Sequence, residues 1–468
     1  MMREKRVKRQ PIQAAVLTKE DKKAFNRELL TLAVPLALQN LLVALVGASD
    51  ALMLGRLNQA SIAAVSLANQ VSFVMSLFTG SVIGAIGVLV AQYMGKGDTK
   101  NAKRFLAMAI RYSVGISLVF FLLALLIPEH VMAVFTQDRE MIEIGAGYLR
   151  IVGFSYVFSG IAQSYLMMMR IQGRVKMSLW ISAITVIVDM SADFFLIYGV
   201  GKWQGFGANG SAYSTIAVEF LAMMICIIEA RQKDHVHPDM ESMRFFSKDF
   251  ERDVWHVAPG MLASALSWGL SMTVHAFIMG HLGTDVTAAY SVTGVAQTLM
   301  QGLTHGLASG AGIMLGKMLG QNQFERAKAY GKRFFGVSFV NGLINMGLIA
   351  LVGPLVYIFY ALEPQAKQYL VYMLLYHLLY MFAYAYNTVF TVGVLPSGGD
   401  AKYDAYSVFI ATWCFAIPLS MLGCFVFHWP VMVVYMVMCC DEIVKFPFLY
   451  LRFNTDIWLK NLTREEIV

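Results

Sequence analysis

Residues 55–66 read GRLNQASIAAVS, and residues 280–291, which begin 225 positions later, read GHLGTDVTAAYS. Five of the twelve positions are identical. The same offset pairs Gly95 with Gly320. A repeat at this spacing predicts that one structural unit, about half the chain long, occurs twice.

The amino-acid composition places both units in a membrane. The 468 residues are 57% hydrophobic and 14% charged, and the mean hydropathy is +0.58, whereas soluble proteins average roughly 25% charged residues. Twelve near-uncharged stretches reach the length of about 20 residues that a membrane helix needs. We therefore expect an all-α polytopic membrane protein with 12 transmembrane helices in two six-helix lobes related by the internal repeat.

The predicted spans are six in each half. They cover residues 29–54, 61–93, 104–127, 140–169, 177–200 and 208–230, and then residues 253–282, 286–316, 334–360, 367–395, 403–427 and 430–453. The corresponding domains are an N-terminal tail (1–28), an N-lobe (29–230), a linker (231–252), a C-lobe (253–453) and a C-terminal tail (454–468). Because each half has an even number of spans, both lobes should share one orientation and face each other across an axis along the membrane normal.

The distribution of Lys and Arg predicts the orientation. Of the 37 basic residues, 32 fall on the side of the two termini, 4 fall on the other side, and Arg150 lies inside a span. Lys445 is counted with the first group. The positive-inside rule then places both termini in the cytoplasm and the chain in the plasma (inner) membrane. The net charge of +7 is explained by contact with anionic membrane lipids, and no nucleic-acid partner is expected.

Several carboxylates lie inside apolar spans, where an ionised group costs several kcal/mol unless it is paired or solvated. Glu219 is in the sixth span, and Asp441 and Glu442 are in the last, where Lys445 follows at helical spacing and could pair with either.

Three aspartates are candidates for an ion site. Asp50 closes the first span, and Asp189 and Asp193 lie in the fifth. The last two are four residues apart, so a helix places them on one face. Two like charges in a poorly solvated site either share a proton or hold a cation such as Na⁺ between them, and the residues alone do not decide between these.

Five features carry a family resemblance. They are Pro35 fifteen residues before Asp50, GRL at 55–57 followed by Ala63 and Ala64, DFFLIYG at 193–199, the small-residue stretch Gly207–Thr215, and GGDAK at 398–402. Their order and spacing, over nearly the whole chain, resemble multidrug and toxic compound extrusion (MATE) transporters of the MOP superfamily. The resemblance implies an antiporter that exports organic cations or amphipathic drugs in exchange for H⁺ or Na⁺ by alternating access, with no other cofactor.

The resemblance also implies roles for individual residues. Asp50, Asp193 and Thr215 would form a coupling-ion site in the N-lobe, with Asp189 at a position where the family usually has Asn. The coupling ion would be either Na⁺, bound among the three aspartates, or H⁺, bound to their carboxylates. Pro35 would act as a hinge, because a proline within a helix removes one backbone hydrogen bond and leaves a place to bend.

The second half departs from the NorM-like branch of the family. No acidic residue lies between Val254 and Leu282, so the acidic C-lobe site of that branch should be absent. Five residues are candidates for a substrate cavity instead: Met272, His275, Tyr384, Tyr386 and Asn387. His275 occupies the repeat position of Asp50. Each of them has the alternative interpretation of ordinary packing or hydrogen bonding between helices.

Other functions fit the sequence less well. A lipid-linked oligosaccharide or other lipid flippase of the same superfamily should line its cavity with Arg and Lys for phosphate, yet Arg150 is the one basic residue placed inside a span. An enzyme is not expected, because HExxH, P-loop and GxSxG motifs are missing from the sequence. We expect the chain to act as a monomer.

Overall fold

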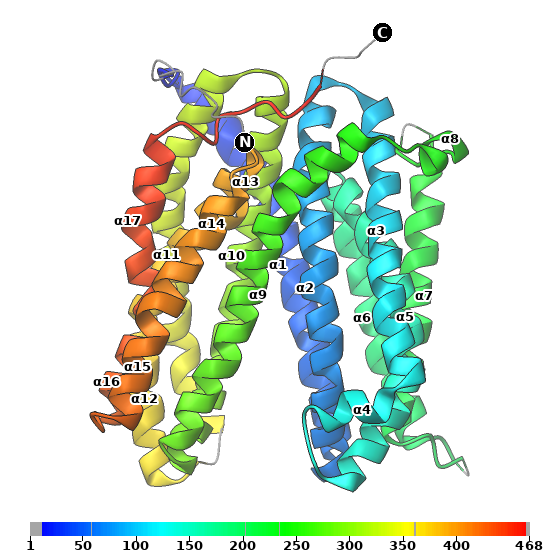
Figure 1. Ribbon diagram of the computed structural model, residues 1–468, viewed down its shortest axis with the longest axis vertical. Coiled ribbons are helices and arrows are strands. Elements are labelled where there is room, and N and C mark those ends of the chain that lie inside the picture. The colour runs from blue at the N-terminus through cyan, green and yellow to red at the C-terminus, as the bar shows by residue number, and fades with distance from the viewer. Residues whose placement is uncertain (1–11, 58, 202, 234, 360–361, 465–468) are drawn as a thin grey trace.

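The computed structural model describes residues 12–464 except 58, 202, 234 and 360–361. In this part of the chain the regular elements are helices, with one isolated β-bridge between Val200 and Trp203. Figure 1 shows two bundles of long helices standing side by side. The prediction of an all-helical protein with two lobes is confirmed.

The N-lobe holds the first seven helices. They are α1 (Lys19–Gly55), α2 (Gln59–Lys96), α3 (Thr99–Leu126), the short α4 (Pro128–Ala133), α5 (Arg139–Ile171), α6 (Val175–Tyr198) and α7 (Ala208–Ala230). A short helix, α8 (Met240–Arg244), lies in the linker and is capped at its N-terminus by the Asp239 side chain.

The helices of the C-lobe are interrupted more often than those of the N-lobe. Its elements are α9 (Lys248–His281), α10 (Thr284–Gly320), α11 (Phe324–Phe359), α12 (Pro364–Thr388), the π-helical turn η1 (Val389–Val394), α13 (Leu395–Ser397), α14 (Ala401–Val408), the π-helical turn η2 (Phe409–Ala416), α15 (Ile417–Phe425), α16 (Val431–Met438) and α17 (Asp441–Asn454). Pro396 and Pro418 follow the two π-helical turns closely. Since proline donates no backbone hydrogen bond, the helix before it changes its pattern.

The two lobes match helix for helix at the offset of the sequence repeat. Moved by 225 positions, α2 would cover 284–321, and α10 covers Thr284–Gly320. In the described residues, ten helices are long and apolar enough to cross a membrane. The two remaining units are α10 and the pair α16 and α17, where a break at Cys439 and Cys440 leaves pieces of 8 and 14 residues. Together they give the six-plus-six plan that the sequence predicts.

Some helices begin earlier than predicted. Helix α1 begins at Lys19, so residues 19–28 belong to a helix although the sequence assigned them to the N-terminal tail. The reason is a capping box, in which Thr18 accepts from the backbone of Asp21 and the Asp21 side chain accepts from the backbone of Thr18. Residues 1–11 of the predicted tail lie outside the described part.

Two glycines at equivalent repeat positions let the lobes meet. A Cβ at Gly95 on α2 would lie 2.1 Å from the carbonyl oxygen of Lys317, and one at Gly320 on α10 would lie 1.9 Å from the carbonyl oxygen of Gln92. Gln92 and Lys317 are themselves 225 positions apart. The crossing of α2 and α10 is therefore a pseudo-twofold contact, and only residues without a Cβ allow this approach.

Replacing one of these glycines should force the lobes apart. Gly320→Val places a branched side chain against the α2 backbone, and overpacking of this kind costs about 1–3 kcal/mol. In a variant without the five native cysteines, maleimide labelling of Ala91→Cys, a buried site that faces Gly316, should accelerate about tenfold. The control is Gly336→Val on α11, where a Cβ meets no atom within 4 Å. Equal labelling in both variants would contradict a tight crossing.

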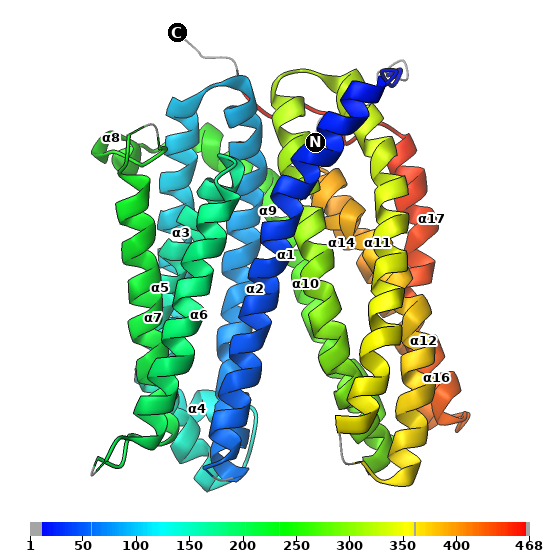
Figure 2. The same ribbon diagram turned by 180° about the vertical axis from the view of Figure 1, so that it is seen from behind.

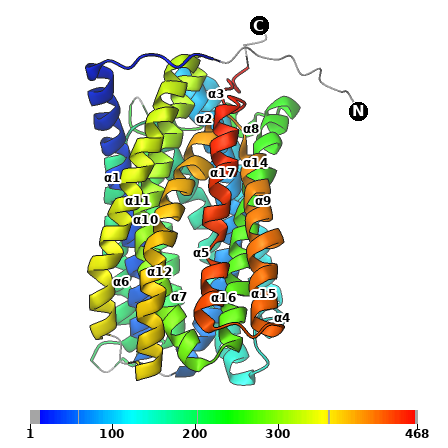
Figure 3. The same ribbon diagram turned by 90° about the vertical axis from the view of Figure 1, so that its left-hand side faces the viewer.

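The close contacts between α1 and α10 lie toward one end of the molecule. Gly310, Gly306 and Gly302 of α10 face Leu32, Ala37 and Asn40 of α1, respectively, and Asn40 Nδ2 donates to the carbonyl oxygen of Gly302 at 3.1 Å. From there the two helices diverge toward the opposite end (Figure 2). Figure 3 shows that the start of α1 and the end of α17 share the end at which the lobes touch.

The chain after α17 crosses from the C-lobe to the N-lobe at this same end (Figure 1). Trp458 is fully buried. Farther along, the backbone N–H of Leu462 donates to Gln92 Oε1 at 2.6 Å, and Arg464 pairs with Asp253 at 2.6 Å. The predicted C-terminal tail is therefore packed against both lobes as far as Arg464.

Candidate functional site

The three predicted aspartates of the N-lobe come together. Asp50 lies near the end of α1, and Asp189 and Asp193 lie on one face of α6. One carboxylate oxygen from each residue lies within 4.8 Å of the others. Asp193 is 1% exposed and Asp189 is 7% exposed. Asp50 is partly buried. Two buried acids and a partly buried one at such short distances favour a bound cation or proton, because little water is available to screen their mutual repulsion.

The hydrogen bonds of this triad are incomplete. Ser214 of α7 donates to Asp189 Oδ1 at 3.1 Å. The Oδ1 atoms of Asp50 and Asp193 have no hydrogen-bond partner among the described residues. Since a buried oxygen without a donor is costly, these two atoms are the ones available to a coupling ion.

The hydroxyl beside the triad differs from the expected one. Thr215 donates to the carbonyl oxygen of Ser211, at 2.9 Å, whereas its neighbour Ser214 contacts Asp189. A close crossing of α6 and α7 determines this register, because a Cβ at Gly210 would lie 2.4 Å from the carbonyl oxygen of Leu196. Sequence reasoning did not identify Ser214, since adjacent hydroxyls on a helix are distinguished only by the rotation of that helix.

Helix α1 is tied to α6 one turn beyond Pro35. Gln39 Nε2 donates to Ser182 Oγ at 2.6 Å, and Ser178 Oγ donates to Gln39 Oε1 at 3.2 Å. Nearer the triad, Tyr198 Oη donates to the carbonyl oxygen of Met53 at 2.6 Å. These bonds hold Asp50 against the acids of α6. Gln39 was not among the predicted site residues.

A cavity of about 460 Å³ lies between α2 and the interior of the C-lobe. Tyr384 and Asn387 line it, as predicted, together with His305, which lies 3.0 Å from the Tyr384 hydroxyl. Tyr386 does not line it, contrary to the prediction. Its ring packs against Phe390 and Phe446, with centroids 5.4 and 4.8 Å away.

The other two predicted cavity residues lie elsewhere. Met272 and His275 line a separate hollow of about 20 Å³ within the C-lobe, which is too small for an organic substrate. His275 is buried, and its Nε2 has no partner among the described residues. His275 occupies the position that corresponds to Asp50 in the sequence repeat. In the described residues, however, it does not belong to a cluster of acids like the one around Asp50.

The C-lobe carries a polar cluster, of which the sequence predicted the pairing of Lys445 with an acid of the last span but not the grouping as a whole. Ser264 Oγ donates to Asp404 Oδ2 at 2.6 Å, and Asn387 Nδ2 donates to Glu442 Oε2 at 2.8 Å. Lys445 forms an ion pair with Glu442. The absence of acids in the seventh span is real, but Asp404 and Glu442 supply carboxylates from α14 and α17.

Lys445 requires a correction. It was counted among the cytoplasmic cations, but it is buried in the C-lobe and lines the large cavity. Its pairing with Glu442 three residues earlier explains why a lysine is stable at this depth. Arg150, which was placed inside a span, is half exposed and pairs with Glu129 of α4.

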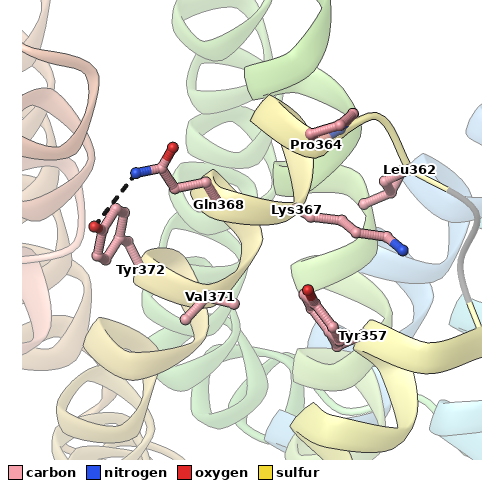
Figure 4. A pocket seen from close by; sticks show the side chains of 7 residues that line it. All are labelled: Tyr357, Leu362, Pro364, Lys367, Gln368, Val371 and Tyr372. Atoms are coloured by element: carbon pink, nitrogen blue, oxygen red, sulfur yellow. Dashed lines mark hydrogen bonds between the residues drawn. The ribbon is translucent and has the colours of Figure 1, made fainter.

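A further hollow of about 420 Å³ lies between the end of α11 and the start of α12 (Figure 4). Lys367 approaches the ring of Tyr357 there, with Nζ 5.2 Å from the ring centroid. Gln368 and Tyr372 also line this hollow, and Figure 4 shows them hydrogen-bonded to each other. None of the predicted site residues line this hollow.

Comparisons with known proteins agree with this architecture. The MatE family profile matches residues 35–195 and 259–422, one segment in each lobe. An uncharacterized transporter, YisQ, of Bacillus subtilis is 21% identical and covers 97% of this chain and 99% of its own. A probable multidrug resistance protein, YoeA, of the same organism is 21% identical over 87% of this chain and 89% of its own.

Solved structures share the fold. A multidrug resistance MATE family transporter of the MOP superfamily, solved in an outward-facing conformation, superposes with a TM-score of 0.82 at 16% sequence identity. The match covers 94% of this chain and 99% of that one. At this sequence identity the likeness shows the fold alone.

Proposed function

The chain belongs to the MatE family of transporters, and from that premise we propose that it is a secondary active antiporter that exports organic cations or amphipathic drugs in exchange for H⁺ or Na⁺. The observation that carries the proposal is the triad of Asp50, Asp189 and Asp193, in which one carboxylate oxygen from each residue lies within 4.8 Å of the others and two of the three acids are buried. A carrier of this kind needs such an ion site in one lobe, together with two states that the ion biases differently.

The orientation of the chain in the membrane determines which end of the protein opens to the outside. We place both termini in the cytoplasm, because the basic residues gather at that end. The end at which the lobes diverge then faces outward. The triad lies in the outer half of the N-lobe, since Asp50 and Asp193 are within five residues of the outer ends of α1 and α6.

Coupling follows from charge. H⁺ or Na⁺ that enters from outside neutralises the triad and weakens its attraction for a cationic substrate, so the substrate leaves outward. Pro35 is the proposed hinge, because it lies one turn before Gln39, which is hydrogen-bonded to α6. A change of charge at the triad would thereby alter the bend of α1 and the contact between the lobes.

The flippase alternative is not favoured by the cavity. Lys445 is the one Lys or Arg that lines it, and its ammonium group is paired with Glu442. A lipid phosphate would therefore meet a neutral ion pair and a second carboxylate, Asp404. A cation fits this lining better than an anion does.

Reconstituted liposomes test the function. The purified full-length protein is placed in vesicles with an imposed Na⁺ gradient, an imposed pH gradient or neither, and transport of a fluorescent organic cation against its own gradient is followed. We expect accumulation with one of the two gradients and none without. Equal movement in all three conditions, down the substrate gradient only, would identify a channel or uniporter and contradict the proposal.

A further inference from the structure

The large cavity has the size and position of a substrate site. Its volume of about 460 Å³ lies within the range of about 300–1,000 Å³ typical of pockets for drug-sized ligands. Ser76 and Gly80 of α2 form one wall, and Trp268 of α9 and Tyr384 of α12 add aromatic surface from the C-lobe. Both lobes therefore contact its contents, as a carrier requires.

The charge around this cavity is net negative. Asp404 and Glu442 line it, and Asp441 directly precedes Glu442 in sequence. Lys445 is the one cation in this group, so three carboxylates share one ammonium ion. When all four groups are ionised, two negative charges are not compensated within the cluster. Such a surface attracts a cation and repels an anion.

Two buried acceptor atoms in the wall have no donor. Asp404 is 8% exposed and Asn387 is 1% exposed, and the Oδ1 atom of each has no hydrogen-bond partner among the described residues. The other polar atom of each side chain is hydrogen-bonded. Ser264 donates to Asp404 Oδ2, and Asn387 Nδ2 donates to Glu442. Because an unpaired buried acceptor is costly, a ligand with N–H or O–H donors that reaches these two atoms would be stabilised by them.

A bare metal ion does not fit this place. In the described residues, Asp50, Asp189 and Asp193 are the one group of three acids, cysteines or histidines whose ligand atoms converge closely enough to hold an ion. The C-lobe carboxylates do not converge in that way. They instead surround a volume large enough for an organic molecule.

We propose that this cavity is the substrate site and that it binds a protonated amine bearing N–H groups, with Asp404 accepting from the ammonium, Asn387 accepting a second hydrogen bond, and Trp268 and Tyr384 contacting the apolar part. The inference rests on the proposed function and refines it. In this proposal the N-lobe binds the small coupling ion and the C-lobe binds the organic cation. A quaternary ammonium ion of the same shape satisfies the charge but not the acceptors.

Equilibrium binding without any gradient tests this site separately from transport. The full-length protein in lipid nanodiscs is titrated with dansylcadaverine, a fluorescent primary amine, and with its N,N,N-trimethyl derivative. We expect the primary amine to bind more tightly. Because a hydrogen bond to a charged group contributes about 1.5–3 kcal/mol, Asp404→Asn should weaken its binding by about tenfold to about a hundredfold and should change the binding of the trimethyl compound less.

Matched variants separate direct contact from general charge. Asp441→Asn removes the same charge from a buried carboxylate that does not line the cavity and already accepts from Thr412 and from the backbone of Glu442. Its effect should be smaller than that of Asp404→Asn, and Asp404→Glu should restore part of the affinity. Equal losses in the two Asn variants, or no preference for the primary amine, would overturn the proposed site. Intact binding with no gradient-driven transport would instead count against the antiport function.

Discussion

Asp193→Asn should abolish ion-driven efflux while leaving a folded, membrane-inserted protein. The side chain keeps its size, but it no longer offers a negative charge or accepts a proton at neutral pH. Asp193 is the most buried of the three acids, and its Oδ1 has no partner among the described residues. Without the Asp193 carboxylate the triad loses the unpaired oxygen that we expect to bind the coupling ion. Efflux from the reconstituted vesicles should fall to the level of vesicles without protein.

Asp189→Asn is the matched comparison on the same helix. The family resemblance implies Asn at this position, and Ser214 already donates to Asp189 Oδ1. We therefore expect this variant to retain efflux and to change the ion concentration at which exchange is half maximal. Efflux that persists in Asp193→Asn at the wild-type rate would remove the triad from the mechanism, and a loss of folding is excluded by gel filtration of the purified variant.

The sequence predicted those parts of the structure that depend on local spacing. Asp189 and Asp193 share a face because they are four residues apart, and Gly95 and Gly320 meet equivalent partners because the repeat offset is uniform. The approach of Asp50 to these acids was predicted through the family resemblance, since spacing along the chain does not bring α1 to α6. The triad is therefore the best-predicted element of the site.

What the sequence did not predict depends on how helices cross and rotate. Asp404, Asn387 and Glu442 lie on three different helices, and no local pattern shows that they share one cavity. The spacing of Lys445 from Asp441 and Glu442 predicted an ion pair, but it did not show that the pair lines a cavity. Tyr386 and Asn387 are neighbours in sequence, yet one packs against aromatic rings and the other faces the cavity. Helix rotation decides such cases.

The lobes share a plan but differ in what they hold. The N-lobe helices α5 and α6 are continuous, whereas their C-lobe counterparts are interrupted by η1 and η2. Thr391 and Val392 of η1 line the cavity, and Thr412 of η2 donates to Asp441. Because a π-helical turn widens the helix and re-aims the side chains that follow, the interruptions place polar groups of the C-lobe where the N-lobe has an uninterrupted wall.

The second large effect is expected from Gln92→Leu at the end where the lobes touch. Gln92 is fully buried on α2. Its Nε2 donates to the carbonyl oxygens of Ser397 at 2.7 Å and Lys460 at 3.2 Å, and its Oε1 accepts from the backbone of Leu462 at 2.6 Å. One N-lobe side chain thus satisfies three backbone groups of the C-lobe and the C-terminal segment.

Leucine has a similar size but cannot form these bonds. Each buried backbone group left without a partner costs about 1–3 kcal/mol, so the state in which the lobes touch at this end should lose several kcal/mol relative to the state in which they separate. That loss shifts the population by about a hundredfold or more. The carrier would then rarely open outward, and efflux should fall although the triad is intact.

Distances between the lobes measure this shift directly. Spin labels on α3 and α11, at Lys103→Cys and Lys332→Cys in a background without native cysteines, should report a longer distance in Gln92→Leu than in the parent protein. Gln163→Leu is the control, because Gln163 is an exposed residue of α5 within a single lobe. The prediction fails if the distance distribution of Gln92→Leu matches that of the control. Its success would mean that the proposed alternating access depends on a hydrogen-bonded contact at the terminus-bearing end as well as on the ion site. In the proposed cycle these three bonds break and re-form each time.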